Sequence, residues 1–375
     1  MTDSISKFRQ NARAWLAEHT PESPPPPDGP ESREYALAWQ RTQAAGGWAG
    51  IAWPKEMGGC GATVLEQIVW FEEYARAAAP SPLGPTFVGL NHAGPTLIAC
   101  GTPEQKAFHL PRIVNGDTIW CQGFSEPGAG SDLAGLKTSG TVDGDALVIH
   151  GHKTWSSFAD IADWQELLVR TDGAAKTSAA LTWVICPMNA PGITVRPIRT
   201  MAGAYKFCEV FYDGIRIPLS NIVGGLNNGW RTAMSTLAFE RGTASLALLI
   251  ALTLKVEQLL RACPEDRPAM RARIAQLRAE GAAVRAMAYR LALDSTASMP
   301  DSSGSLVRLG FAEYAQRVNA AAIDLFGIDA PEVVGMHGIG HDYLDAYSET
   351  IAGGTSEIQR NIIAERMLGL PRGPR

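Results

Sequence analysis

The sequence predicts a multidomain α+β protein with an N-terminal all-α domain, a middle β domain and a C-terminal four-helix bundle. Three observations support this prediction. Apolar residues recur at helical spacing in residues 1–118, alternate with polar residues in 119–228, and return to long helical patterns in 229–375. Because helices and strands do not alternate along the chain, a Rossmann fold is disfavoured.

The N-terminal region, residues 1–118, is expected to be helical. Phe8, Ala12 and Trp15 share one helical face, and residues 68–75 form a second apolar face. Between these patterns, residues 21–30 contain six prolines, which forbid a helix and predict an exposed, extended loop. Residues at the very start mix polar and apolar side chains without an apolar run, so they do not resemble a secretory signal.

The middle region, residues 119–228, is expected to be a compact β domain. Alternating apolar residues separated by Asp-Gly, Pro-Gly and Asn-Gly turns indicate strands at 146–150, 166–170, 180–185, 195–198 and 208–212. The C-terminal region, residues 229–375, is expected to form an antiparallel bundle from helices at 230–262, 265–294, 305–326 and 342–367.

Composition argues against several classes of protein. The net charge of −5 gives no global basic field, so nucleic acid is not an expected partner. The longest apolar stretch lies within residues 243–256. A membrane span needs about 20 residues, so this shorter stretch suits a buried helix better than a membrane span. The six cysteines show no Cys-x-x-Cys spacing and no pairing with histidine, which favours reduced thiols in a cytoplasmic protein without a metal site.

Two loops in the β region could contact a cofactor. Residues 125–132 read Ser-Glu-Pro-Gly-Ala-Gly-Ser-Asp, and their clustered N–H groups and hydroxyls could bind a planar heterocycle or a phosphate. The alternative is a tight β turn. In the second loop, Trp155 precedes Ser156 and Ser157, so its ring could stack on a flavin while a hydroxyl bonds the polar edge. The alternative is a tryptophan that only fills the core of the β domain.

Two further motifs lie in the C-terminal region. Residues 353–360 read Gly-Gly-Thr-Ser-Glu-Ile-Gln-Arg and could hold an anion or the polar chain of a cofactor, or simply begin a helix capped by Ser356 with Glu357. Glu240 and Arg241 interrupt a strongly apolar helical pattern. A carboxylate there is costly unless it is paired or used, and desolvation would raise its pKa toward that of a general base. The alternative is an ion pair within or between helices.

Taken in this order, these motifs resemble the acyl-CoA dehydrogenase family. The family loop Thr-Glu-Pro-x-x-Gly-Ser-Asp is matched at residues 125–132, with Ser125 in place of the first threonine. The flavin-side loop Gly-x-Lys-x-Trp-Ile-Thr is matched by Gly151, Lys153, Trp155 and Ser157. Residues 209–230 look like the family's exit from the β domain, and residues 354–366 are similar to its last helix.

The resemblance implies FAD as the cofactor and an acyl-CoA as the substrate. The residues that it implies for FAD are Gln122, Phe124, Ser125, Gly130, Ser131, Trp155, Ser156, Ser157, Thr355 and Glu357. Those that it implies for the substrate are Ser131, Phe239, Arg241 and Gly353.

One departure from the family pattern concerns the catalytic base. Most members carry a glutamate immediately before the Gly-Thr-Ser of the last helix, but this chain has Gly353 there. A smaller branch, which includes isovaleryl and long-chain types, places the glutamate immediately before the arginine on the first bundle helix. Glu240 stands at that place, before Arg241. The resemblance therefore implies Glu240 as the base.

A second departure concerns the adenine side of FAD. Family members bind it from a neighbouring subunit through Arg-x-x-Phe-Gly and Gln-x-x-Gly-Gly. The first motif is absent between residues 255 and 285, and the second is reduced to Asp-Leu-Phe-Gly-Ile at 324–328. Either Arg261, Arg267 or Arg271 substitutes in a homo-oligomer, or a related subunit completes the site in a heterotetramer, as in some actinobacterial steroid-degrading members.

The resulting expectation is α,β-dehydrogenation of an acyl-CoA to a trans-2-enoyl-CoA, with electrons passed to an electron-transfer flavoprotein. Three alternatives stay open. The chain could be an acyl-CoA oxidase or flavin monooxygenase on the same fold, a flavin-poor subunit of a heteromeric dehydrogenase, or a purely structural helical protein. The sequence does not specify the acyl group.

Overall fold

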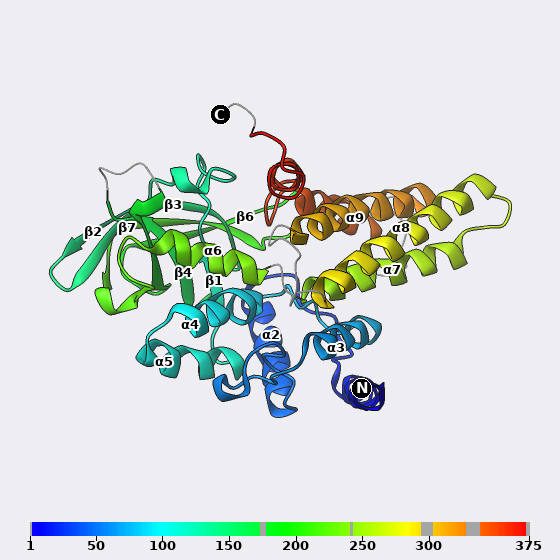
Figure 1. Ribbon diagram of the computed structural model, residues 1–375, viewed down its shortest axis with the longest axis horizontal. Helices are drawn as coiled ribbons and strands as arrows, with labels where there is room; N and C mark the ends of the chain where they lie inside the picture. The colour runs from blue at the N-terminus through cyan, green and yellow to red at the C-terminus, as the bar shows by residue number, and fades with distance from the viewer. Residues whose placement is uncertain (1, 173–177, 241–242, 294–302, 328–337, 373–375) are drawn as a thin grey trace. The chain divides into compact units, whose positions relative to one another are not determined.

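The computed structural model describes residues 2–172, 178–240, 243–293, 303–327 and 338–372. The chain forms two compact units whose segments interleave along the sequence. Unit 1 comprises residues 1–24, 63–81 and 243–375, and unit 2 comprises residues 25–62 and 82–242. The expected order of helices, then strands, then helices is confirmed (Figure 1). The boundaries at residues 118 and 228 stay a prediction.

The described part of unit 1 is helical. Its long helices α7 (Ser245–Ala262), α8 (Pro268–Leu293) and α9 (Gly304–Phe326) pack side by side, as Figure 1 shows. Helix α3 (Val64–Arg76) packs against α7 and against α1 (Thr2–His19). The shorter helices α10 (Ile339–Asp345) and α11 (Ser356–Ile362) pack against α9.

Two of the helices expected in the C-terminal region differ from the prediction. The segment 230–262 is not one helix but α6 (Gly229–Glu240) in unit 2 and α7 in unit 1. Thr243 lies in a turn before α7, where its Oγ1 donates a hydrogen bond to Oε1 of Gln67 at 2.8 Å. The segment 342–367 is also interrupted, because Gly353 and Gly354 have φ values of 62° and 90°, which an α-helix does not accommodate.

Unit 2 is built on one mixed sheet. The strands occur in the order β6-β7-β3-β2-β4-β5-β8, and β1 pairs with β4 in parallel. The strands expected from the sequence are confirmed, and short strands that the alternation did not identify complete the sheet. The strands of the sheet, expected and additional, are β1 Trp120–Gly123, β2 Ser139–Asp143, β3 Ala146–Ser157, β4 Trp164–Arg170, β5 Leu181–Pro187, β6 Ile193–Ile198, β7 Phe207–Pro218 and β8 Ile222–Val223.

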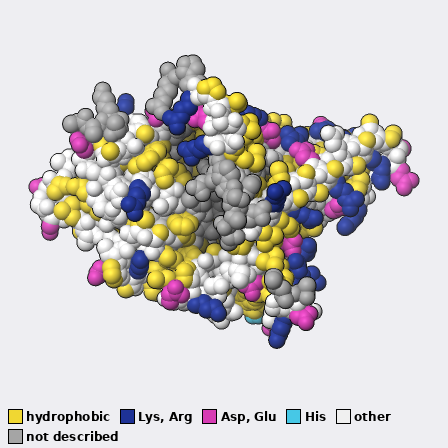
Figure 2. Space-filling view, in the orientation of Figure 1, with side chains coloured by type: hydrophobic (Ala, Val, Ile, Leu, Met, Phe, Trp, Pro, Cys, Tyr) yellow, Lys and Arg dark blue, Asp and Glu magenta, His cyan; other side chains and the backbone are white. Residues whose placement is uncertain are grey.

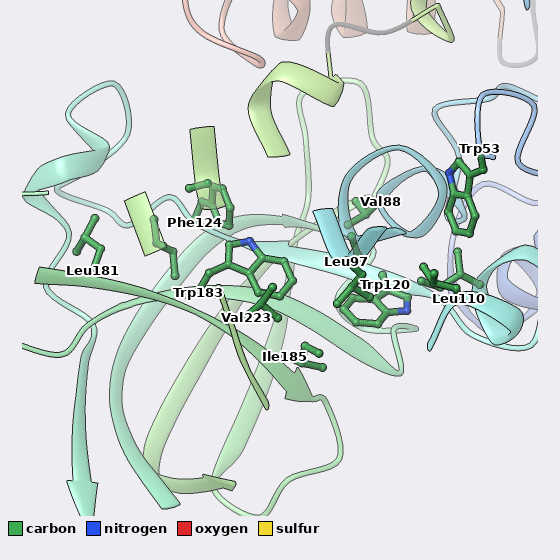
Figure 3. Packing of buried hydrophobic residues seen from close by; sticks show 14 of the residues in the cluster. Trp53, Val88, Leu97, Leu110, Trp120, Phe124, Leu181, Trp183, Ile185 and Val223 are labelled. Atoms are coloured by element: carbon green, nitrogen blue, oxygen red, sulfur yellow. The ribbon is translucent and has the colours of Figure 1, made fainter. Parts of the chain in front are cut away.

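An apolar core joins this sheet to the helices of unit 2, which are α2 (Gly29–Ala45), α4 (Gly94–Cys100), α5 (Pro103–Val114) and α6. Figure 3 shows Trp120 and Trp183 in this core with Leu97 close by. Each fully buried large apolar side chain stabilises the fold by roughly 1.5–3 kcal/mol. The start of α4 approaches Trp53 closely, since a Cβ on Gly94 would lie 2.0 Å from a ring carbon.

The surface of the long helices is mixed in charge. Figure 2 shows Lys and Arg side chains interspersed with Asp and Glu over α7 and α8. One such pair joins Arg278 Nε to Glu257 Oε1 at 2.5 Å. Within the described ranges, no helix has both the length and the apolar character needed to cross a membrane.

A cluster of charges anchors α1 to α3 in unit 1. The carboxylate of Glu73 accepts hydrogen bonds from Arg9 Nη1 at 2.6 Å, Arg13 Nε at 2.8 Å and Arg76 Nη1 at 2.6 Å. Burial alone would raise the pKa of Glu73. The hydrogen bonds from Arg13 and Arg9 and the charge of Arg76 outweigh burial and lower this pKa to about 2.

We predict that Glu73→Gln lowers the free energy of unfolding by about 1–3 kcal/mol, because it removes the charge that satisfies these guanidinium groups. Since the pKa of Glu73 is lower in the folded protein, its stabilisation is present above the ordinary pKa of 4.5 and is lost as pH falls toward 2. Thermal unfolding between pH 7 and pH 3 measures both effects. The exposed-pair variant Glu257→Gln is the control, and equal loss in the two variants contradicts the prediction.

Candidate active site

The loop at residues 125–132 leaves strand β1 and turns back immediately. Glu126 and Ala129 exchange two backbone hydrogen bonds of 3.1 Å, so the tight β turn weighed above is present at the start of the loop. Beyond it, Gly130 and Ser131 are exposed. A Cβ added to Gly128 or Gly130 would meet no atom within 4 Å, which leaves open space over this backbone.

A buried ion pair fixes this loop to strand β3. The Lys153 ammonium is fully buried and donates hydrogen bonds to Glu126 Oε1 at 2.9 Å and to the carbonyl of Phe124 at 3.0 Å. The other Glu126 contacts are the N–H groups of Lys137 at 2.7 Å and Thr138 at 2.8 Å. The motif at residues 125–132 and the motif at residues 151–157 therefore contact each other through the side chains of Glu126 and Lys153.

The pKa values of the pair reflect its burial. Loss of water around Lys153 lowers its pKa to about 8, although the Glu126 carboxylate acts in the opposite direction. Burial alone would raise the pKa of Glu126, but Lys153 and the hydrogen bonds to Thr138 and Lys137 bring it below its usual value. Both groups therefore depend on one another to stay charged inside the protein.

Strand β3 carries an extra residue where Trp155 lies. Lys153 pairs with Val210 and Ser156 with Cys208, so three steps along β3 match two along β7. Trp155 takes the left-handed conformation, with φ of 60°, and its side chain is 58% exposed. The alternative in which this tryptophan only fills the core is therefore wrong, because the bulge turns the ring to the surface.

The residues next to Trp155 add polar groups. Ser156 is buried, and within the described part of the chain its Oγ has no hydrogen-bond partner. Ser157 is half-buried and pairs with Phe207 on β7. The rings of Phe207 and Trp155 are nearly perpendicular, with 5.9 Å between their centres.

These features fit the flavin ring of FAD. Trp155 offers an exposed aromatic face, Ser156 offers a hydroxyl with unused hydrogen-bonding capacity, and the backbone beside Gly130 has room for close approach. Phe124 is itself part of the apolar core (Figure 3). The whole residue is 4% exposed, and its carbonyl accepts the hydrogen bond from Lys153.

Gln122 belongs to a buried polar cluster that the sequence analysis did not identify. Its Nε2 donates to Glu166 Oε1 at 2.8 Å, and His92 Nδ1 lies 3.1 Å from the same oxygen. The available signal was a glutamate within the otherwise apolar run at 166–169 of β4.

Helix α6 places the proposed base at its last residue. Thr236 of α6 is hydrogen-bonded to Thr96 of α4 through their hydroxyls at 2.8 Å, which holds the helix within unit 2. Phe239 is 36% exposed. The backbone of Glu240 ends the helix, while its side chain and Arg241 lie outside the described residues.

The remaining candidates form a separate group in unit 1. Thr355, not Ser356, caps α11: its Oγ1 accepts a hydrogen bond from the N–H of Ile358 at 3.2 Å. The expected cap at Ser356 is therefore wrong, because the helix begins at Ser356 itself, one residue earlier than that cap requires. Gln359 Nε2 donates to the carbonyl of Gly353 at 2.9 Å, and the Glu357 side chain is 78% exposed.

The arginines considered as substitutes for the missing adenine-side motif differ in their contacts. Arg267 donates to the carbonyls of Leu325 and Asp324 at the end of α9, at 3.2 and 3.3 Å. Arg271 donates to the carbonyl of Cys263 at 2.8 Å. These two guanidinium groups already satisfy backbone acceptors of their own chain.

Comparison with known families covers nearly the whole chain. Residues 2–117 match the N-terminal domain of acyl-CoA dehydrogenases, residues 121–215 the middle domain and residues 227–368 the C-terminal domain.

The relatives agree with this match. The chain is 37% identical to acyl-CoA dehydrogenase IpdE1 of Mycobacterium tuberculosis, over 98% of both chains. The solved structure of the Tcur3481-Tcur3483 steroid ACAD matches at 30% identity with a TM-score of 0.87, covering 99% of this chain and 98% of that one. The ChsE4-ChsE5 complex from Mycobacterium tuberculosis matches at 29% identity and 0.82, covering 100% and 99%. The chain belongs to the acyl-CoA dehydrogenase family and is therefore an oxidoreductase.

Proposed function

We propose that this chain catalyses FAD-dependent α,β-dehydrogenation of an acyl-CoA thioester to a trans-2-enoyl-CoA and passes the electrons to an electron-transfer flavoprotein. The observation that supports it most is the buried Lys153–Glu126 pair. It joins the loop at 125–132 to the strand that presents Trp155, and so builds one surface from the two parts that a flavin ring requires.

The residues of that surface have separate tasks in the proposal. Trp155 stacks on the ring, Ser156 and Ser157 bond its polar edge, and the backbone from Gln122 to Ser131 borders the ring and the CoA chain. Thr355 and Glu357 hold the polar chain of FAD; the Thr355 hydroxyl can still donate while its oxygen accepts from Ile358. When bound, FAD supplies the acceptor for the hydride that leaves the β carbon.

Glu240 is the proposed base that removes the α proton. Hydrogen bonds to the thioester carbonyl acidify the α C–H, and a carboxylate within reach completes the proton transfer. Gly353, where most family members have a glutamate, carries no side chain and has φ of 62°. A glutamate there would adopt a backbone conformation that is strained for any residue with a Cβ. The glycine at position 353 and the glutamate at position 240 therefore both favour Glu240 as the base.

The substrate class named for a similar solved structure supports a bulky acyl group on the substrate of this chain. The structure that matches at 30% identity is described as a steroid acyl-CoA dehydrogenase. We propose a ring-bearing, steroid-derived acyl-CoA for this chain and a cytoplasmic location. All six cysteines are free thiols, which is consistent with a reducing compartment.

We predict that Glu240→Gln keeps FAD bound but slows reduction of the flavin by acyl-CoA about 10²- to 10⁴-fold, because the amide cannot take the α proton. Anaerobic mixing with acyl-CoA, followed by loss of the visible flavin absorbance, measures this. The control is Glu34→Gln on α2, whose side chain is 70% exposed. Unchanged bleaching in the Glu240 variant contradicts its role as the base.

A flavin-poor subunit of a heteromeric dehydrogenase is the second candidate. The specific observation in its favour is that Arg267 and Arg271 are engaged with backbone carbonyls of their own chain. In addition, one of the solved structures that this chain resembles, the ChsE4-ChsE5 complex, contains two different proteins.

The visible spectrum and the FAD content of the purified full chain distinguish the two candidates. A self-sufficient homo-oligomer is expected to contain about one FAD per chain, as each chain then completes a site for a neighbour. A colourless chain that gains flavin only after mixing with a related subunit supports the second candidate and contradicts the first.

A further inference from the structure

Glu166 is a fully buried carboxylate in the middle of strand β4. Its Oε1 accepts a hydrogen bond from Nε2 of Gln122 at 2.8 Å and lies 3.1 Å from Nδ1 of His92. His92 is also buried, with 4% of its surface exposed, whereas Gln122 is half-buried. Gln122 is therefore the member of this trio that can reach a ligand.

Three separate elements bring these side chains together. Gln122 and Glu166 are direct partners in the parallel pairing of β1 with β4, so their side chains project from the same face of the sheet. His92 comes from a single π-helical turn, Gly89–Ala93, which packs against both β1 and α6. The ring of Phe87 contacts His92 edge-on at 4.9 Å between ring centres.

Stability alone does not explain a glutamate at this position. The next three residues of β4, Leu167, Leu168 and Val169, are all fully buried. Replacing a buried ionic or polar group by a well-packed apolar one is often neutral or stabilising. The neighbouring Gln165, on the opposite face, satisfies a structural partner instead, since its Oε1 accepts a hydrogen bond from the Tyr212 hydroxyl at 2.5 Å.

The contact with Glu166 determines how the Gln122 amide is oriented. A carboxylate only accepts hydrogen bonds, so it selects the NH₂ end of the amide and excludes the rotamer with the carbonyl oxygen inward. His92 supplies a second polar contact to the same oxygen, 3.1 Å away. The carbonyl oxygen of Gln122 is consequently directed away from the carboxylate and is available as an acceptor.

We propose that Glu166 and His92 are positioning residues that orient the Gln122 amide so that its carbonyl oxygen accepts a hydrogen bond from the bound FAD. This inference rests on the proposed function. Gln122 lies three positions before Ser125, in the segment that borders the proposed flavin surface. An oxidised flavin ring carries one N–H group among several acceptors, so a fixed acceptor at one place selects one orientation of the ring.

The experiment compares FAD binding and flavin spectra among variants of the full chain. FAD-depleted protein is titrated with FAD, and the dissociation constant and the visible spectrum of the bound flavin are recorded. We expect Glu166→Gln to weaken FAD binding about tenfold or more and to shift the flavin spectrum, because an amide at 166 accepts either orientation of Gln122. His92→Gln is expected to change both in the same direction and decides the question if the first variant does not fold.

Two further variants separate positioning from general damage to the strand. In a Gln122→Met background, Glu166→Gln should have no further effect on FAD affinity, because its effect acts through Gln122. The matched control Gln165→Met removes a buried polar contact from the adjacent position of β4. It should lower the melting temperature and leave the FAD dissociation constant unchanged.

The outcomes are distinct from those that test the proposed function. Equal FAD affinity and equal spectra in wild type and Glu166→Gln overturn this inference alone. A Glu166 effect that persists in full without Gln122, or that Gln165→Met reproduces, also overturns it. A wild-type protein that binds no FAD overturns this inference together with the proposed function.

Discussion

The candidate site depends on one buried interaction, the ion pair between Lys153 and Glu126. The loop at 125–132 has no strand or helix of its own to hold it in place, and beside the ion pair only the N–H of Thr154, which donates to the carbonyl of Ser125 at 2.9 Å, is described as joining it to the paired strand β3. Lys153 bonds the loop through the carboxylate of Glu126 and the carbonyl of Phe124, while Glu126 accepts from the backbone N–H groups of Lys137 and Thr138, which follow the loop in the chain. A buried pair of this kind is costly to desolvate, and its retention is most readily understood as geometric specification rather than stability. What it specifies here is the position of an exposed tryptophan beside an open glycine-bearing backbone.

A second constraint comes from the division of the chain. The loop, Trp155, the buried Gln122 cluster and helix α6 all belong to unit 2, whereas Gly353, Thr355 and Glu357 belong to unit 1. Glu240 ends α6, just before the boundary between the units at residues 242 and 243. Under the proposed function, the proton acceptor is thus carried by the same unit as the flavin surface. A base at 353 would instead come from the other unit and from a backbone conformation that favours glycine.

The sequence was sufficient for the order of helices and strands and for the family, because both depend on local patterns. Periodicity identifies β3 to β7, and motifs such as residues 125–132 are contiguous. It failed where the deciding contact is long-range. The interruption before α7 is stabilised by the bond from Thr243 to Gln67, and Glu166 meets His92 across 74 positions of sequence. The sequence also left open whether Trp155 stacks on a flavin or fills the core, and the bulge revealed by the pairing with β7 decides against the core.

The most direct test of this account is the FAD dissociation constant of Lys153→Met compared with that of Lys137→Met. Both substitutions remove the charge of a lysine that bonds Glu126. Lys153 bonds it through its buried ammonium, whereas the Lys137 side chain is exposed and only its backbone N–H bonds Glu126. The account predicts that Lys153→Met loses about 3–5 kcal/mol of unfolding free energy, since Glu126 is left buried without its partner, and that FAD binding weakens at least about tenfold. Lys137→Met should match wild type. A folded Lys153→Met protein that binds FAD as tightly as wild type would contradict the claim that this ion pair builds the flavin surface.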